Sequence, residues 1–72
     1  MKVRAKFYLA HREEHPEGFN LTFQPVTGGS PENDEFFKYT PHGELKMGTI
    51  NPEAAMSFEV GQEYYLDLIK AE

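Results

Sequence analysis

The sequence predicts an all-β fold, or a β-rich α+β fold, built as a small five-stranded antiparallel barrel with one or two short helices. Three observations predict it: short stretches in which apolar and polar residues alternate, turn-forming residues between them, and a length of only 72 residues. Hydrophobic residues make up 39% of the chain and aromatic residues 14%, which favours a packed core over disorder. We expect one domain spanning residues 1–72.

The first strand is expected at residues 2–9, where the period is two. One face is apolar and carries Val3, Ala5, Phe7 and Leu9. The other face is polar and carries Lys2, Arg4, Lys6 and Tyr8. This alternation is typical of a half-buried strand.

A hairpin is expected next. Residues 11–18 are polar and include Pro16 and Gly18, so they predict its loop. Alternation resumes at residues 19–24, with Phe19, Leu21 and Phe23 facing inward, and Pro25 ends the ladder because proline lacks a donor N–H.

The middle of the chain allows two interpretations. Ser30 followed by Pro31 and acidic residues predicts one or two helical turns towards Phe36. The aromatic residues that follow could equally open a strand, so a second hairpin is expected from residues 37–40, a turn at 40–43 and a strand at 44–50.

The last third predicts a short helix and a final strand. Asn51 and Pro52 form a capped helix start, and the helix is expected to run towards Phe58. The strand is expected at residues 63–70. In a barrel of the oligonucleotide-binding or Src-homology-like sort, the helix would plug the open end with Met56 and Phe58.

Charge is distributed unevenly along the chain. The first twelve residues carry +4 and residues 13–72 carry −9, for a net charge of −5. If the first and last strands are neighbours, Glu63 and Asp67 form ion pairs with the basic face within the fold. The alternative is a single-stranded nucleic-acid-binding surface, whose residues would be Lys2, Arg4, Lys6, Tyr8 and Lys38.

A protein-binding surface fits the acidic body better. Acidic residues gather beside aromatic ones in the middle of the chain: Glu32, Asp34, Glu35, Phe36, Phe37 and Tyr39. Such a charged rim around aromatic anchors is typical of a binding site for another protein. Because side chains alternate along a strand, one of Phe36 and Phe37 should be exposed or covered by a partner.

Enzymatic chemistry has little support in the sequence. The chain has no cysteine, and no serine or threonine sits in a strand-to-helix elbow near a histidine. Residues 11–15 match the zinc-peptidase pattern H-x-x-E-H, but that motif needs a helix and a much larger domain, whereas here it follows a strand and precedes Pro16. We expect no enzyme, no cofactor and no metal.

Several stretches of the chain resemble a group of small uncharacterised proteins encoded by tailed bacteriophages and prophages. The stretches are FFKYTPHGE at 36–44, NPEAA at 51–55, FEVGQEYYLD at 58–67, MKVRAKFY at 1–8 and QPVTGGS at 24–30. Residues 10–20 diverge from the pattern. The resemblance implies a phage gene product made in a host bacterial cytoplasm, and no particular activity.

The function expected from these observations is non-catalytic binding of another protein, from the host or from the phage. It would act either as a host-directed regulatory or anti-defence factor or as a minor virion or assembly component, with self-association as a further option. No apolar run is long enough for a membrane span and the basic N-terminus does not match a signal peptide, so no membrane partner is expected.

Overall fold

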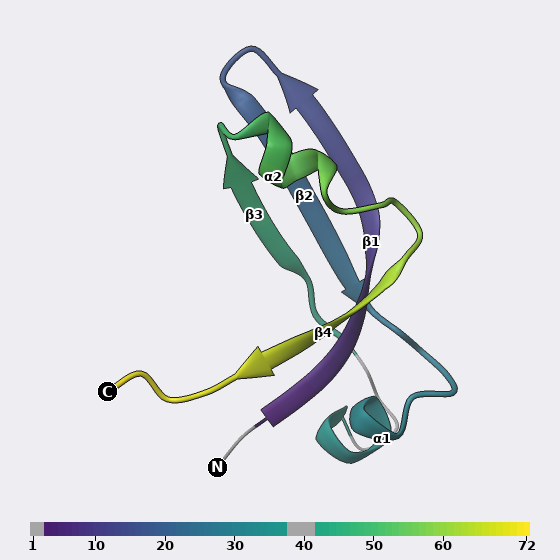
Figure 1. Cartoon of the computed structure of the whole chain (residues 1–72). Helices are drawn as coiled ribbons and strands as arrows, with labels where there is room; N and C mark the ends of the chain where they lie inside the picture. Colours follow the sequence, from purple (N-terminus) through teal and green to yellow (C-terminus); the bar gives the residue numbers. More distant parts are fainter. Residues whose placement is uncertain (1–2, 38–41) are drawn as a thin grey trace.

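The fold of residues 3–37 and 42–72 is described by a computed structural model. Its elements in chain order are β1 (Val3–His15), β2 (Gly18–Pro25), α1 (Pro31–Phe37), β3 (Leu45–Thr49), α2 (Pro52–Met56) and β4 (Glu63–Leu68). The strands form one antiparallel sheet in the order β3-β2-β1-β4. The sheet curls into half a barrel, with α2 over one face and α1 at one end (Figure 1).

The mostly β architecture predicted from the sequence is confirmed, whereas the five-stranded barrel is wrong, because the sheet has four strands in the described residues and is open. Within the described residues there are four strands, and β3 and β4 lie at opposite edges of the sheet. Closure would require these two edges to pair. The chain between them is used for α2 and the turn after it, and it carries β4 to the far side of β1 instead (Figure 1).

The expected second hairpin is not found among the described residues. Phe37 is the last residue of α1, and β3 pairs with β2, from Phe23 opposite Leu45 to Phe19 opposite Thr49. The eight-residue strand β2 provides a free edge long enough for the whole of β3. Residues 38–40 of the expected strand lie outside the described part of the chain.

The loop expected at residues 11–18 is much shorter in the structure. β1 continues to His15, and only Pro16 and Glu17 separate it from β2. This polar part of β1 forms a strand because its backbone groups pair with β2, up to the pair of His15 with Gly18.

A β-bulge at Ala10 divides β1 into two halves. The register shifts between Leu9, which lies opposite Phe23, and His11, which lies opposite Thr22. The extra residue reverses which positions face inward. Arg12 therefore lies on the inner side, where its guanidinium donates a 2.6 Å hydrogen bond to the carbonyl oxygen of Phe58.

The core lies on the inner face of the curled sheet. Its buried members come from β1 and β2, and partly buried residues from the other elements pack against them. The buried set is Ala5, Phe7, Leu9, Leu21 and Phe23, and the surrounding set is Phe37, Leu45, Phe58, Tyr64 and Leu66. The inward positions predicted for the first two strands are thus largely confirmed.

Both helices begin where the sequence predicts. The hydroxyl of Ser30 accepts a hydrogen bond from the Asn33 N–H, and Oδ1 of Asn51 accepts from the N–H groups of Glu53 and Ala54. The plug expected from Met56 is wrong, because its side chain is 59% exposed. The capped start of α2 sets the phase of this short helix so that Ala55 faces the sheet, and Phe58 packs on Phe23 and Tyr64.

Candidate protein-binding site

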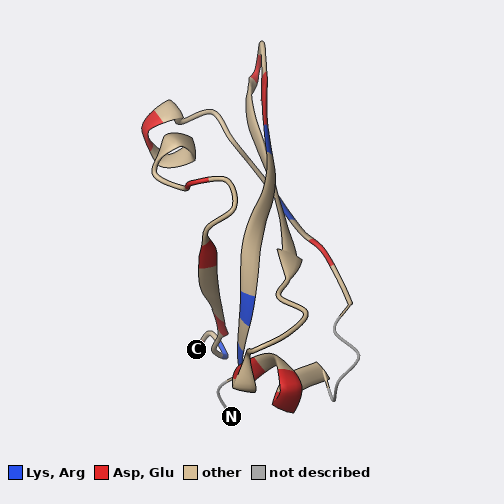
Figure 2. Ribbon diagram, turned by 90° about the vertical axis from the view of Figure 1, so that its right-hand side faces the viewer, with Lys and Arg blue, Asp and Glu red and all other residues tan. Residues whose placement is uncertain are grey.

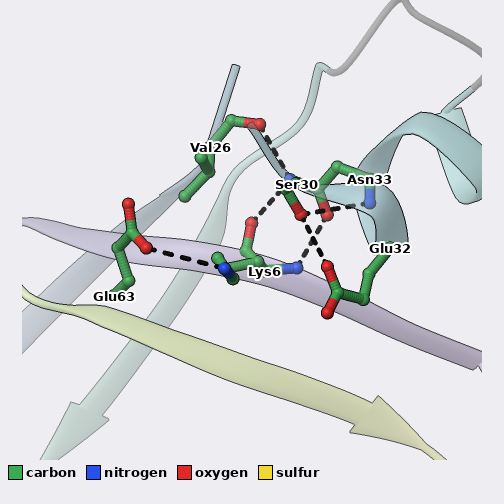
Figure 3. A network of polar contacts seen from close by, with 6 residues as sticks. All are labelled: Lys6, Val26, Ser30, Glu32, Asn33 and Glu63. Carbon is green, nitrogen blue, oxygen red and sulfur yellow. Dashed lines mark hydrogen bonds and ion pairs between the residues drawn. The ribbon is translucent and has the colours of Figure 1, made fainter. Parts of the chain in front are cut away.

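The acidic and aromatic residues expected to bind a protein lie on α1. This helix is fastened to β1 by Asn33, whose side chain is 2% exposed. Its Oδ1 accepts from the Lys6 N–H at 2.7 Å, and its Nδ2 donates to the carbonyl oxygens of Lys6 and Val26 at 2.7 and 2.8 Å (Figure 3). The amide of Asn33 thereby takes the place of a neighbouring strand at this point of β1, and it holds the remaining face of α1 outward.

Phe36 and Phe37 divide their roles between surface and core. Phe36 is 49% exposed, whereas Phe37 packs against the core, with its ring centroid 6.5 Å from that of Phe7. The two neighbouring rings meet edge to face at 4.8 Å and 76°. One aromatic of the pair is exposed, as expected, although helical geometry and not strand alternation is the reason. The exposed ring of Phe36 is therefore held in place by the partly buried ring of Phe37.

Two exposed acidic residues precede this exposed ring on the helix. Asp34 and Glu35 are exposed, and among the residues described neither has a cation within ion-pair distance. Figure 2 shows acidic residues on α1 at one end of the sheet and on the β1–β2 hairpin at the other. Tyr39, the sixth residue of the expected site, lies outside the described residues.

Glu32 has a structural role at the start of α1. Its carboxylate accepts a 3.0 Å hydrogen bond from the Ser30 hydroxyl (Figure 3). Its pKa is lowered by a hydrogen bond to its own backbone N–H first, and then by the Ser30 hydroxyl, with smaller contributions from the Tyr65 hydroxyl and the charge of Lys6. This carboxylate is therefore engaged within the fold, while Asp34 and Glu35 face solvent.

The described residues of the nucleic-acid alternative, Arg4, Lys6 and Tyr8, lie on the outer face of the sheet. β1 and β4 are neighbours, as expected, and Arg4 lies opposite Asp67. The guanidinium makes two hydrogen bonds to that carboxylate, of 2.7 and 3.0 Å, and this pairing raises the pKa of Arg4. Lys6 Nζ lies 3.7 Å from a carboxylate oxygen of Glu63.

Tyr8 is likewise engaged within the sheet. Its hydroxyl donates a 3.0 Å hydrogen bond to the side-chain oxygen of Gln24 on β2. Lys2 and Lys38, the other members of the nucleic-acid set, lie outside the described residues. The basic face thus contains Arg4 and Lys6 with acidic partners already in place.

Tyr65 is a central residue of this face that was not among the expected site residues. Its ring lies opposite Lys6, with the Arg4 guanidinium 4.7 Å and the Lys6 ammonium 5.4 Å from its centroid. The expected pairing of the first and last strands contained the signal, since it placed residue 65 on the same outer face as the basic residues.

The histidines of the H-x-x-E-H pattern are spread along a strand. His11 is exposed on the outer face, whereas Nδ1 of His15 accepts a 3.2 Å hydrogen bond from the Glu17 N–H in the turn. Residues four apart in a strand are separated by about 13 Å, so these two cannot share an ion as they would on a helix. Among the residues described, no three His, Asp or Glu side chains gather in a metal-binding arrangement.

Comparison of the chain with known protein families, curated proteins and solved structures found no match. In the described part of the chain, none of the helices has the length and apolar character needed to cross a membrane.

Proposed function

We propose that this protein is a non-catalytic binding module that engages another protein through the exposed face of α1. The observation that carries the proposal is Phe36, an aromatic side chain that is half exposed, in contact with the ring of Phe37 and preceded on the helix by the exposed residues Asp34 and Glu35. A rigid aromatic anchor loses little conformational freedom on binding, and anchors of this kind supply much of the affinity of protein interfaces.

The charge of the site favours a basic partner surface. Asp34 and Glu35 lack cationic partners among the described residues, and the whole chain carries −5. Carboxylates at the rim of an interface mainly accelerate association with a positively charged partner, and salt screens this attraction. The partner surface would therefore combine an apolar recess for Phe36 with lysine or arginine residues around it.

Single-stranded nucleic acid is the alternative ligand. Arg4 and Lys6 would have to exchange Asp67 and Glu63 for phosphates, and those acids would remain beside the bound strand. This exchange releases fewer counterions than binding by unpaired cations does, so it weakens the electrostatic attraction. Protein binding is favoured for this reason.

The resemblance to small phage proteins supports the proposed setting. We propose that the protein works in the cytoplasm of a bacterial host, either on a host protein or as a minor component of virion assembly. As for the fold, we propose that the curled sheet is an opened relative of the oligonucleotide-binding or Src-homology-like barrels. Protein analysis of purified particles from a phage that encodes the chain separates the two uses, because only an assembly component would be abundant in them.

The binding surface can be tested with matched variants. Immobilised wild-type protein is exposed to a lysate of host cells, and each captured protein is tested again as a purified component. Phe36→Ala and Glu35→Lys should each weaken that binding about tenfold or more, whereas Met56→Ala, which removes another exposed apolar side chain, should leave it unchanged. If Phe36→Ala has no more effect than Met56→Ala, α1 is not the binding surface.

A parallel titration with labelled single-stranded oligonucleotides tests the alternative. We expect no binding at about 0.1 M salt, where nonspecific attraction to phosphates is already partly screened. Binding that is abolished by the double variant Arg4→Glu and Lys6→Glu would replace the protein-binding proposal with the nucleic-acid one.

A further inference from the structure

A recess lies between the β1–β2 turn and the start of α2, at the end of the sheet opposite α1 (Figures 1 and 2). It has a volume of about 420 Å³, and we call it the tip recess. Its apolar lining consists of Pro16, Phe19, Ile50 and Pro52, and its acidic lining of Glu14 and Glu17. The tip recess is thus separate from the α1 surface.

Ile50 forms one wall of the tip recess. Its side chain is 83% exposed, yet its backbone is held on both sides. The Asn51 N–H donates a 3.0 Å hydrogen bond to the Thr49 hydroxyl, across Ile50. Gly18 approaches so closely that a Cβ there would lie 3.1 Å from the Ile50 Cα. Ile50 is therefore preorganised for a contact, although its side chain faces solvent.

The β1–β2 turn forms the opposite wall. Nδ1 of His15 accepts a 3.2 Å hydrogen bond from the Glu17 N–H, and His15 pairs with Gly18 across the hairpin. Phe19, the next residue of β2, pairs with Thr49 of β3, so the sheet connects the two walls. A recess whose walls are fixed in this way loses little conformational freedom when it is filled.

The charge at the tip recess is negative. Glu14 and Glu17 are exposed, and among the residues that the structure describes neither carboxylate has a cation within ion-pair distance. Arg12 lies on the same face of β1 as Glu14, but its guanidinium bonds to the Phe58 carbonyl. The recess therefore attracts a positively charged occupant. It disfavours nucleic acid, an anionic membrane and a second copy of this chain, whose net charge is −5.

We propose that the tip recess is a second protein-binding site, which takes an apolar side chain flanked by lysine or arginine residues on a partner protein. The apolar lining gains from burying such a side chain, and the two carboxylates attract the cations beside it. The α1 surface has the opposite form, since there Phe36 projects and the partner supplies the recess. The tip recess does not depend on what α1 binds, and one chain with both sites can connect two partner surfaces.

Short peptides test the tip recess, because a peptide offers an anchor side chain but no recess for Phe36. The probe is the blocked pentapeptide Lys-Lys-Leu-Lys-Lys, titrated into the isotope-labelled full chain and followed by NMR. We expect the amide signals of Gly18, Phe19 and Ile50 to shift, with a dissociation constant on the order of 1 mM at low salt. The matched peptide Lys-Lys-Ser-Lys-Lys should bind about fivefold or more weakly, because serine buries little apolar surface.

Matched variants of the chain locate the site. Ile50→Ser and Glu17→Lys should each weaken binding of the leucine peptide about fivefold or more. Ile69→Ser, at a 67% exposed position outside the recess, and Glu35→Lys, which makes the same charge change on α1, are the controls and should leave binding unchanged. All four positions are exposed, so the variants should keep the fold. Phe36→Ala should also have no effect, which separates this site from the α1 surface.

Four results would overturn the inference: no shift with up to about 10 mM peptide, shifts confined to residues of α1, equal binding of the leucine and serine peptides, or an effect of Ile50→Ser no larger than that of Ile69→Ser. The second result would place peptide binding on the α1 surface. The third would mean that the recess attracts cations without holding an apolar side chain.

Discussion

Asn33 is bonded to Lys6 as a neighbouring strand would be. Its side-chain amide both accepts from the Lys6 N–H and donates to the Lys6 carbonyl, each at 2.7 Å. β2 ends at Pro25, opposite Phe7, so it offers no strand partner to Lys6. The Val26 N–H adds one further bond, of 3.0 Å, to the Lys6 carbonyl. One asparagine thus satisfies the end of β1 and positions α1 at the same time.

Replacing this asparagine should be costly. Asn33→Ala would remove three partly buried hydrogen bonds, and of the backbone groups involved only the Lys6 carbonyl keeps another bond, from the Val26 N–H, so we expect the free energy of unfolding to fall by about 2–4 kcal/mol. Urea denaturation measures this change. Asp34→Ala, at the next and exposed position of the same helix, is the control and should change stability by less than about 0.5 kcal/mol. Equal effects of the two substitutions would contradict the role assigned to Asn33.

Gly18 is required by the close approach of β2 to the end of β3. Its φ is +142°, and a Cβ at this position would lie 2.5 Å from the Thr49 carbonyl oxygen and 3.1 Å from the Ile50 Cα. Both neighbours are backbone atoms, which cannot move aside as a flexible side chain can. Gly18→Ala should therefore destabilise the fold by about 2–4 kcal/mol, from backbone strain and overpacking together.

The matched control is Gly28→Ala. A Cβ there would meet no atom within 4 Å, and φ lies outside the left-handed range. This substitution should be neutral or stabilise by up to about 0.5 kcal/mol, because alanine restricts the unfolded chain. Thermal unfolding gives the melting temperature of both variants. Equal melting temperatures for Gly18→Ala and Gly28→Ala would contradict the explanation.

Local patterns predicted much of the fold. Alternation in β1, β2 and β4 identified the strands, and the pairs Ser30-Pro31 and Asn51-Pro52 located both helix starts, because capping depends on residues close together in the sequence. The expected pairing of the first and last strands also predicted that Glu63 and Asp67 lie against the basic face, and the ion pairs of Arg4 with Asp67 and of Lys6 with Glu63 confirm it.

Structural features that depend on contacts between residues far apart in the chain could not be predicted from the sequence. The bulge at Ala10 reverses the facing of β1, and Arg12 accordingly bonds to Phe58, 46 positions away. Asn33 is a residue type common near helix starts, yet the hydrogen-bond partners of its side chain lie 27 and 7 residues away in the chain. Alternation cannot indicate a bulge in a polar stretch, since polar residues on both faces look the same in either phase.

Replacing each of the two phenylalanines of α1 should affect stability to a different extent. Phe37→Ala would remove a ring that packs on Phe7 and the core, so we expect a loss of about 2–3 kcal/mol, below the range for a fully buried phenylalanine. Phe36→Ala should cost about 0.5 kcal/mol or less, because its ring is half exposed. Chemical denaturation compares the two. A larger loss for Phe36→Ala than for Phe37→Ala would mean that the exposed ring supports the fold.

Lowering the pH should reduce the contribution of Glu32 to the stability of the fold. Because hydrogen bonds to its backbone N–H and to the Ser30 hydroxyl hold the pKa of Glu32 below its ordinary value of 4.5, the folded state favours the ionised carboxylate. Its stabilising effect is fully present above pH 4.5 and is lost as the pH falls through the lower value in the folded protein. Wild type should therefore exceed Glu32→Gln in stability at pH 7, and the difference should shrink at pH 3.

Tyr65→Phe provides the graded control for this effect. It keeps the ring between Arg4 and Lys6 but removes the hydroxyl that makes a smaller contribution to the lowered pKa of Glu32. The pH-dependent loss should be reduced in this variant but not removed, since the Ser30 hydroxyl and the backbone N–H remain. Urea denaturation of the three proteins at both pH values measures this order. A stability difference between wild type and Glu32→Gln that stays constant from pH 7 to pH 3 would show that the carboxylate charge is not what the fold uses.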